Sequence, residues 1–472
     1  MNKIGLFILA LFVSVNAFAA NRVATPTGSG NNSGTDWSNA CKGFSGNCAW
    51  SALARGDTLY FGGNGHYSAQ GTVNTPTSGS AVITIKGAIA SDHGTDAGWS
   101  AALGVDAHSA FWDTAGCTTY PNCNFAILTT GYWVFDGQVA ADPTNAATYG
   151  IQLTFPDCNY GILAMYLGNN VQTINNVTLR YMALDASSCG SVSSQRMLIE
   201  MQAQGIHSNE TISHFFCSGA SNCISIRSPG APSDGDLIEY GYITNAFGDS
   251  NHHGNALNLY GSNTNITIRY NRILSAVGTG TVVAELPVVG AGIYGNVFAH
   301  GAGGNGVIAP TSGSYWANAH VYNNTFASNS GDWYLGCLAG DGACASATGN
   351  IVEDNIVWNE SCKLGGGDNP THDSNSYLVC SNSAPTETNG QALSMNPFVG
   401  ASSDDYHLTQ NPVANCATSG STCFGTVLTS SYALDMNGDY FGVNGLWQRG
   451  AYPYVTASSA PSSPANLSAT VQ

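Results

Sequence analysis

The stretch 249–255 (DSNHHGN) places two adjacent histidines beside an aspartate and two asparagines, in a chain with only 11 histidines. Histidine acts as a base near neutral pH, and an Asp or Asn beside it can orient it or hold a cation. We therefore interpret His252 and His253 as candidate catalytic residues, and Asp249 and Asn255 as substrate-binding residues. Metal binding by the histidine pair is disfavoured, because adjacent residues of a strand point to opposite faces. The alternative is a turn that hydrogen-bonds to its own backbone, with both histidines solvated.

A second set of candidates comes from short apolar segments that we expect to form successive strands, at 197–201, 224–227, 256–260, 282–286 and 307–309. At the position that follows the inward apolar residues, these segments carry Glu200, Arg227, Tyr260 and Glu285, and then Ala309. Two carboxylates, an arginine and a tyrosine are residue types that sugar chemistry uses. We predict catalytic roles for Glu200, Arg227 and Glu285, and substrate binding by Tyr260. The alternative is that outward strand positions are polar in any case, and a register shift of one residue would turn every side chain over.

Two reactions are open to these residues. Elimination needs a base, here Arg227 or His253, that removes the proton alpha to a uronate carboxylate, and a cation or arginine that neutralises that carboxylate. Hydrolysis needs two carboxylates that flank the bond, drawn from Glu200, Glu239 and Glu285. The residue types alone do not decide between them.

A nine-residue pattern that recurs along the middle of the chain must position these candidates. Its copies begin at residues 176, 209, 235, 265, 290, 318 and 349, which is 25 to 33 residues apart, so they indicate a repeat architecture. The fourth position is always aliphatic, the ninth is always apolar, and the seventh is Asn271, Asn296, Asn324 or Asn355 in four copies. Asparagine enters a left-handed turn at low cost, and stacked asparagines can hydrogen-bond between repeats. We therefore predict a bend at the seventh position and a stack of asparagines.

A short strand, a bend and a second strand form one corner of a coil. A coil of about 28 residues is too long for a hexapeptide β-helix and too short for a propeller blade. With this pattern, residues 24–455 resemble the pectate-lyase-like right-handed parallel β-helix superfamily. The segment 55–67 resembles the opening coils of secreted members, and 435–455 resembles the segment that closes many bacterial members. The resemblance implies an all-β solenoid whose coils stack about 4.8 Å apart.

The resemblance also implies a polysaccharide substrate bound in a groove along the coil, where the turn 249–255 would lie. Polygalacturonase-type members carry Asp-Asp, Gly-His-Gly and Arg-Ile-Lys motifs, which this sequence lacks. Pectate-lyase-type members often use a Lys or Arg base with Ca²⁺, but Lys42, Lys86 and Lys363 all lie outside the central repeats. We expect a secreted carbohydrate-active protein that cleaves a polysaccharide as a lyase or glycoside hydrolase. The alternative is a non-catalytic surface or matrix protein that binds glycans through the same faces.

Calcium is the one cofactor for which the sequence offers candidate ligands. The pairs Asp234/Asp236 and Asp435/Asp439 could bind Ca²⁺, but neither lies in a complete calcium-binding loop, so we favour turns. The net charge of −17 disfavours nucleic acid and anionic membranes as partners, and it disfavours polyanionic glycans unless a cation bridges them.

Residues 1–20 have the positive start, the apolar core and the small-residue cleavage site of a secretory signal peptide, and no later segment is apolar enough to span a bilayer. The 14 cysteines fall into seven close couples, which predicts disulfides in an oxidising compartment: extracellular, cell-surface or periplasmic. The couples are Cys41/Cys48, Cys117/Cys123, Cys158/Cys189, Cys217/Cys223, Cys337/Cys344, Cys362/Cys380 and Cys416/Cys423.

The expected organisation has four parts. After the signal peptide, residues 21–56 form an N-terminal cap over the open end of the coil, and residues 57–455 form the β-helix. Residues 456–472 begin as a flexible linker rich in Ser, Ala and Pro. The last residues resemble the first strand of a fibronectin type III module, which would make additional C-terminal modules part of the native protein.

Overall fold

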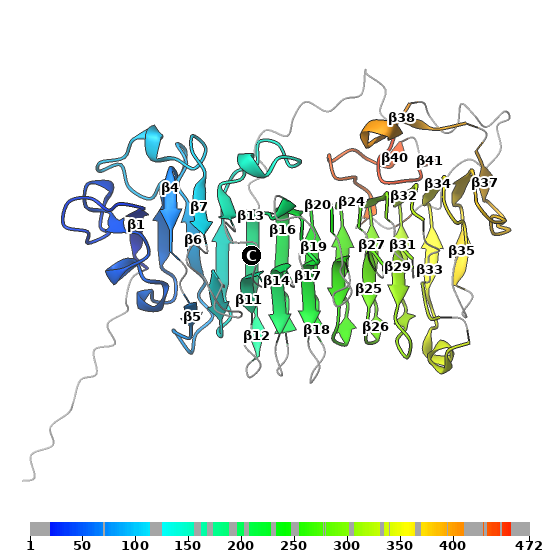
Figure 1. Ribbon diagram of the computed structural model, residues 1–472, viewed down its shortest axis with the longest axis horizontal. Helices are drawn as coiled ribbons and strands as arrows, with labels where there is room; N and C mark the ends of the chain where they lie inside the picture. Colours follow the sequence, from blue (N-terminus) through cyan, green and yellow to red (C-terminus); the bar gives the residue numbers. More distant parts are fainter. Residues whose placement is uncertain are drawn as a thin grey trace, which may run out of the picture.

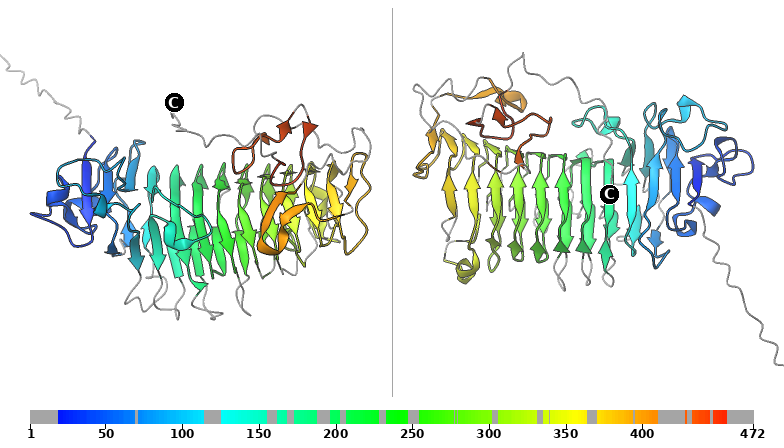
Figure 2. Two further views of the ribbon diagram at one scale, coloured as in Figure 1. Left: turned by 90° about the horizontal axis from the view of Figure 1, so that it is seen from above. Right: turned by 180° about the vertical axis from the view of Figure 1, so that it is seen from behind.

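The computed structural model shows a right-handed parallel β-helix, as the sequence predicts (Figures 1 and 2). It describes residues 19–454 except 69–70, 114–124, 155–161, 168–172, 188–195, 203–206, 228–232, 247–253, 277, 279, 302–305, 331–334, 339, 364–369, 394, 410–427, 429–431 and 444–445. Three parallel sheets run along the molecule, with 23, eight and six strands. The described residues contain no α-helix.

The strands follow one another in a fixed order within each coil. One coil consists of β19 (Leu237–Glu239), β20 (Tyr242–Thr244), β21 (Asn255–Leu259) and β22 (Asn263–Thr264), and the next begins at β23 (Thr267–Arg269). The first two strands belong to the large sheet, the third to the eight-stranded sheet and the fourth to the six-stranded sheet.

The remaining elements have the following bounds. In the large sheet they are β1 (Asn21–Thr25), β2 (Cys41–Lys42), β3 (Thr58–Phe61), β4 (Gly65–Tyr67), β6 (Ile83–Gly87), β7 (Ala110–Asp113), β9 (Trp133–Asp136), β10 (Ile151–Thr154), β13 (Val177–Asp185), β16 (Thr211–Ser218), β24 (Arg272–Leu274), β27 (Gly292–Tyr294), β28 (Val297–Ala299), β31 (His320–Tyr322), β32 (Thr325–Ala327), β33 (Ile351–Glu353), β34 (Ile356–Trp358), β35 (Thr371–Asp373), β36 (Ser376–Leu378) and β37 (Gln391–Ala392). In the eight-stranded sheet they are β5 (Gly71–Val73), β8 (Ala126–Leu128), β11 (Ile162–Leu167), β14 (Arg196–Gln202), β17 (Asn222–Arg227), β25 (Val282–Ala284) and β29 (Ile308–Pro310). In the six-stranded sheet they are β12 (Ile174–Asn175), β15 (His207–Ser208), β18 (Ser233–Asp234), β26 (Val288–Val289) and β30 (Trp316–Ala317). Two antiparallel pairs are β38 (Phe398–Gly400) with β39 (Asp405–Leu408), and β40 (Gly442–Val443) with β41 (Leu446–Trp447). Short 3-10 helices are η1 (Trp37–Asn39), η2 (Gly46–Cys48), η3 (Trp50–Ala52), η4 (Ala101–Leu103), η5 (Ala146–Thr148), η7 (Gly342–Ser346) and η8 (Ala401–Ser403).

The aligned repeat pattern is reproduced as strand register. The fourth-position residues pair in one unbroken series and are buried: Leu179, Ile212, Ile238, Ile268, Ile293, Val321 and Val352. The ninth-position residues form a second buried series, from Leu184 to Val357. Burying one such side chain contributes about 1.5–3 kcal/mol, so these two inward columns account for much of the core.

The predicted stack of asparagines is present, and we call it the asparagine ladder: Asn271, Asn296, Asn324, Asn355 and Asn375. From Asn296 onward, each side-chain oxygen accepts hydrogen bonds from the preceding asparagine's backbone N–H and amide nitrogen, at 2.9–3.0 Å. The predicted bend at the seventh position was one residue off. The left-handed residue is the sixth, for example Tyr270 with φ 56° and Gly295 with φ 65°. The ladder asparagines instead contribute the side-chain hydrogen bonds that join successive coils.

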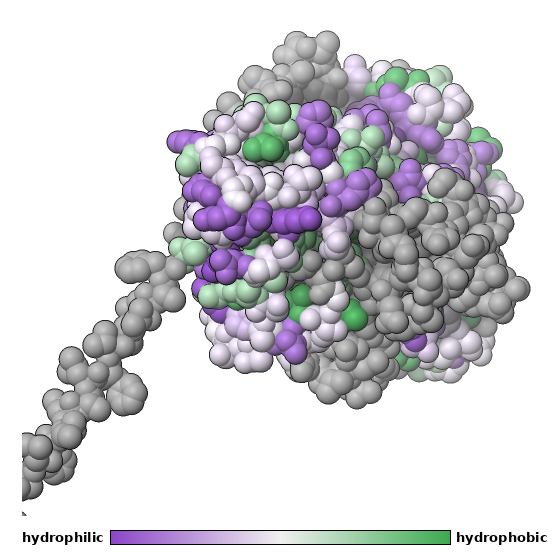
Figure 3. Space-filling view, turned by 60° about the vertical axis from the view of Figure 1, so that its left-hand side comes forward, coloured by the Kyte–Doolittle hydropathy of each residue, from purple (hydrophilic) through white to green (hydrophobic). Residues whose placement is uncertain are grey.

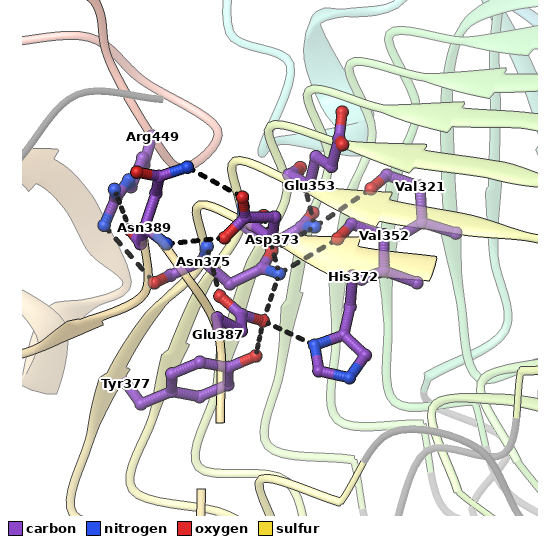
Figure 4. Close-up of polar contacts among 11 residues, drawn as sticks. Val321, Val352, Glu353, His372, Asp373, Asn375, Tyr377, Glu387, Asn389 and Arg449 are labelled. Carbon is purple, nitrogen blue, oxygen red and sulfur yellow. Dashed lines mark hydrogen bonds and ion pairs between the residues drawn. The ribbon is translucent and has the colours of Figure 1, made fainter. Parts of the chain in front are cut away.

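The asparagine ladder ends on a carboxylate. Asn375 donates from its backbone N–H and its amide nitrogen to Glu387, at 2.9 and 2.8 Å. The Tyr377 hydroxyl donates to the same carboxylate at 2.6 Å, and His372 Nδ1 lies 3.1 Å from it (Figure 4). The hydrogen bonds that join one asparagine to the next all point toward this end, so an acceptor with no hydrogen to donate is the appropriate terminus.

The N-terminal segment lies at the opposite end of the coil (Figure 1), and we propose that it is the cap. Strand β1 pairs in parallel with β3, while Phe44 and Trp50 from the intervening segment join the core cluster and are buried. Their rings lie 5.5 Å apart. In Figure 3, which brings this end forward, the described surface is mainly white and purple with small separate green areas. The apolar end of the core is thus covered.

Four of the seven predicted disulfides lie in the described part of the chain, and all four are confirmed: Cys41–Cys48, Cys217–Cys223, Cys337–Cys344 and Cys362–Cys380. The other three couples, Cys117/Cys123, Cys158/Cys189 and Cys416/Cys423, lie outside the described residues, as do the predicted signal core and the segment 456–472. None of the helices in the described part of the chain has the length and hydropathy that a bilayer crossing requires.

We expect no free thiol in the exported protein, because every cysteine has a close partner in the sequence. Thiol titration of the denatured, unreduced protein measures this directly, and two or more free thiols per chain would contradict complete pairing. Production in a reducing cytoplasm should lower the folding yield, because the loops would lose their cross-links. The matched comparison is the same chain produced in an oxidising compartment.

Candidate functional site

Three of the predicted site residues form one outward column on the eight-stranded sheet. Because Ile226 pairs with Leu259 and Leu259 with Ala284, the residues that follow them, Arg227, Tyr260 and Glu285, stand on successive coils. Coils stack at the strand spacing of about 4.8 Å, so these side chains lie within reach of a single sugar unit.

The expected register of the other two column members was wrong by two residues. Glu200 pairs with Ser225, and Gln202 is the residue opposite Arg227. Ala309 pairs with Val283 and not with Glu285. A shift of two residues keeps a side chain on the same face of a strand, so Glu200 still lies on the outward side, in the neighbouring column.

Arg227 joins the two columns. Its Nη1 lies 3.2 Å from Glu200 Oε1, and its guanidinium carbon lies 4.6 Å from the centre of the Tyr260 ring. The Glu200 side chain is only 2% exposed, while that of Arg227 is 32% exposed. Burial raises the pKa of Glu200, and the charge and hydrogen bond of Arg227 oppose this rise. The ion pair and the cation–π contact together fix the orientation of the guanidinium.

The exposure of each group limits what it can do. Glu200 is too buried to touch a polymer and can act only by positioning Arg227. Tyr260 is 37% exposed, so its ring and hydroxyl are available to a ligand. Glu285 is half-buried beside Tyr260. Glu239, the third carboxylate considered for hydrolysis, lies on β19 of the large sheet and is ion-paired with Arg269 at 2.6 Å.

The predicted turn is described only at its end. His252, His253 and Asp249 lie outside the described residues, so their roles stay predictions. Asn255 begins β21 and is fully buried, with its Oδ1 accepting a hydrogen bond from the backbone N–H of Gly280 at 3.2 Å. This bond links successive coils, and the substrate-binding role of Asn255 also stays a prediction.

The acidic pairs considered for Ca²⁺ are engaged within the protein. Asp236 is buried and accepts the backbone N–H of Glu210, while Asp234 accepts from Thr264 and Asn265. Asp435 accepts the backbone N–H groups of Asn437 and Asp439, as in a turn. Among the residues that the structure describes, no group of three or more His, Cys, Asp or Glu has a geometry that could hold a metal ion.

A row of aromatic residues at the bend of the large sheet was not predicted from the sequence. Tyr181, His214, Tyr240 and Tyr270 occupy the sixth position of four successive repeats, and their rings stack with centres 4.6, 4.7 and 5.2 Å apart. We call this row the aromatic ladder. The signal was in the alignment, since the sixth position carries an aromatic ring in these four copies. The sixth position then changes to Gly295, Asn323 and Asp354, so it shows no constant residue class along the repeats, unlike the fourth and ninth positions.

The coil itself defines the class of protein, a right-handed parallel β-helix. No protein-family model matches the chain, and no curated protein sequence matches it. Among solved structures, it is similar to pectate lyase Pel9A, with 13% identity and a TM-score of 0.40, over 92% of this chain and 96% of that one. It is also similar to the PL6 family alginate lyase AlyGC, with 12% identity and a TM-score of 0.36, over 75% of this chain and 53% of that one.

Proposed function

We propose that this protein is a secreted polysaccharide lyase that acts on a uronate-containing chain at the outward face of the eight-stranded sheet. The observation that carries the proposal is the position of Arg227, held between the buried carboxylate of Glu200 and the exposed ring of Tyr260. A partly exposed guanidinium fixed in this way can present its remaining donors to a carboxylate in two parallel hydrogen bonds.

Elimination fits this arrangement better than hydrolysis. Hydrolysis needs two accessible carboxylates that flank one bond. Glu200 is buried, and Glu239 lies on another sheet, which leaves Glu285 without a carboxylate partner among these candidates. Elimination needs only that the uronate carboxylate be neutralised, that a base remove the proton alpha to it, and that the leaving oxygen receive a proton.

In this proposal the roles are assigned from residue chemistry and from the exposure of the described groups. Arg227 neutralises the uronate carboxylate and so makes the alpha proton more acidic. Glu200 is a positioning residue that holds Arg227. The exposed Tyr260 hydroxyl donates a proton to the leaving oxygen, and His252 or His253 is the candidate base. Secretion is supported by the four disulfides, which persist in oxidising compartments.

The test is a screen of the purified chain on neutral and uronate-containing polysaccharides. Elimination produces an unsaturated sugar that absorbs ultraviolet light, whereas hydrolysis produces reducing ends without it. We expect ultraviolet-absorbing products from at least one uronate polymer. Reducing ends without ultraviolet-absorbing products would contradict the lyase and favour a hydrolase. Binding with no product from any polymer would also contradict it and would favour a non-catalytic glycan-binding protein.

Replacing Arg227 with glutamine should lower kcat/KM by about a hundredfold or more, as for loss of a group that stabilises transition-state charge. The matched control is Arg180→Gln, because Arg180 also pairs with a buried carboxylate, Asp136, at 2.7 Å but stands on the large sheet. The control should leave kcat/KM within a factor of about two. Equal losses in the two variants would show that the effect is structural.

A further inference from the structure

The aromatic ladder combines bulky side chains with an uncommon backbone. Tyr181, His214, Tyr240 and Tyr270 have φ angles of 55°, 49°, 52° and 56°. Left-handed backbone is uncommon for residues with large side chains and costs on the order of 1 kcal/mol or more. Later repeats place Gly295, Asn323, Asp354 and Ser374 at the same turn. The turn itself therefore does not require aromatic residues.

The ring edges of this region face outward, because the faces cover one another. Interplanar angles along the aromatic ladder are 29°, 21° and 38°. Beyond Tyr270, Tyr294 and Tyr322 occupy the fifth position of the next two repeats, and the Tyr294 ring is nearly perpendicular to that of Tyr270, at 89°. Tyr432 from the C-terminal segment lies across Tyr294 and Tyr322. Its ring is nearly perpendicular to theirs, at 88° and 82°, with centres 4.7 and 5.2 Å apart. The chain thus shows how a flat ring docks on this surface.

Beside this contact, a cavity of about 260 Å³ remains open over the aromatic ladder. Its lining includes His214, Tyr240 and Tyr270 from the ladder, and also Tyr149 and Tyr242. The volume suits a single ring with a short substituent, since it lies below the range of drug-sized pockets. Within the described part of the chain, the only lining residue with a formal charge at neutral pH is Arg272.

Arg272 is fixed in a defined position at this cavity. Its Nη2 donates to the carbonyl oxygen of Asp404 at 2.8 Å, and its guanidinium carbon lies 5.4 Å from the centre of the Tyr242 ring. No ion pair within 4.0 Å joins it to a carboxylate among the described residues. A guanidinium has five donors, so donors remain for an anionic group in the cavity.

We propose that this cavity binds a small planar aromatic carboxylate. The ring of the ligand lies across the edges of the aromatic ladder, as Tyr432 lies across Tyr294 and Tyr322, and its carboxylate pairs with Arg272. A π-face attracts the electropositive ring edges. A pyranose has no such face, so the cavity favours an aromatic acid over a sugar acid. The site lies on the large sheet and does not depend on the function proposed for Arg227.

The test is calorimetric titration of the full chain with three probes: 4-hydroxycinnamate, its methyl ester and galacturonate. We expect saturable binding of the aromatic acid. The ester should bind about tenfold or more weakly, because it loses a charge-assisted hydrogen bond, and galacturonate should bind more weakly still. In Arg272→Gln, the acid and the ester should bind with similar affinity.

Tyr240→Asn removes one ring of the aromatic ladder without straining the backbone, because Asn323 occupies the equivalent turn with φ 50°. This variant should lose affinity for the acid by about tenfold or more while keeping its thermal unfolding temperature within a few degrees of the parent. Tyr440→Asn, at an exposed tyrosine outside the cavity, is the matched control and should bind as the parent does. Arg227→Gln should also bind unchanged.

Three results would overturn the proposal. The first is that the aromatic acid shows no saturable binding to the parent chain. The second is that galacturonate binds as tightly as the acid, and the third is that a folded Tyr240→Asn variant keeps its affinity for the acid. A variant that unfolds is replaced by His214→Asn, which alters the neighbouring ring at an equivalent turn. Loss of lyase activity in Arg227→Gln with intact acid binding would separate the two sites.

Discussion

Asn324→Ala is expected to lower the free energy of unfolding by about 3–5 kcal/mol. The side chain lies in the middle of the asparagine ladder, and its Nδ2 donates to Ile293 O, Tyr322 O and Asn355 Oδ1 at 2.9–3.0 Å. Its Oδ1 accepts the backbone N–H and the amide nitrogen of Asn296, both at 3.0 Å. Alanine would leave several of these buried groups without a partner, and each such group costs about 1–3 kcal/mol.

Urea unfolding followed by circular dichroism measures this loss. Asn47 is the matched control, because it is exposed and lies outside the asparagine ladder. Asn47→Ala should change the free energy of unfolding by no more than about 0.5 kcal/mol. If Asn324→Ala changed it as little, the asparagine ladder would be a consequence of the coil and not a source of its stability.

Stability should fall as the pH rises from about 5 to about 8, and the buried carboxyl group of Glu360 should contribute to this fall. Glu360 is 3% exposed, and burial raises its pKa to about 8, although hydrogen bonds from Asn329 oppose the rise. The folded state therefore holds a proton that the unfolded chain releases above its ordinary pKa of about 4.3. The contribution of Glu360 is complete below that ordinary value and is lost as the pH approaches 8. The expected loss is about 4–5 kcal/mol.

Glu360→Gln should remove the contribution of Glu360 to this dependence, because an uncharged amide needs no proton to stay buried. Its side-chain oxygen can still accept from the backbone N–H and Nδ2 of Asn329, which now donate to Glu360 at 3.2 and 2.6 Å. Urea midpoints of parent and variant across this pH range provide the comparison, with Asp96→Asn as control because the Asp96 side chain is fully exposed. A slope as steep in Glu360→Gln as in the parent would show that Glu360 does not contribute.

The sequence was sufficient for the coil because inward positions must be apolar in every repeat. The columns through Ile238 and Ile243 could therefore be aligned without ambiguity, and the strand pairs follow them. Outward positions carry no such constraint. Strand β14 runs to Gln202, two residues past Glu200, and nothing in its polarity showed where it ended.

The bend was misassigned for a different reason. Backbone preference favours Asn over Tyr in a left-handed turn. It therefore predicts that the left-handed residue is Asn271 and not Tyr270. Stacking along the aromatic ladder and the hydrogen bonds of Asn271 to the neighbouring coils reverse that preference. Both are contacts between coils, and the backbone preference of a single residue takes no account of such contacts. The same limit applies to Arg227, whose partner Glu200 lies one coil away.

The asparagine ladder also bears on how such a chain can change in length. Residues 265–289 form one coil, and Thr264 stands in register with Val289. Deleting this coil would join Thr264 to Gly290 and bring Asn296 to the place of Asn271, where the backbone N–H of Gly241 now donates to an asparagine oxygen at 2.8 Å. Duplicating it would insert one further identical rung. Whole coils can thus be gained or lost by recombination without a new bonding pattern, which sets the length of the molecule in steps of about 4.8 Å.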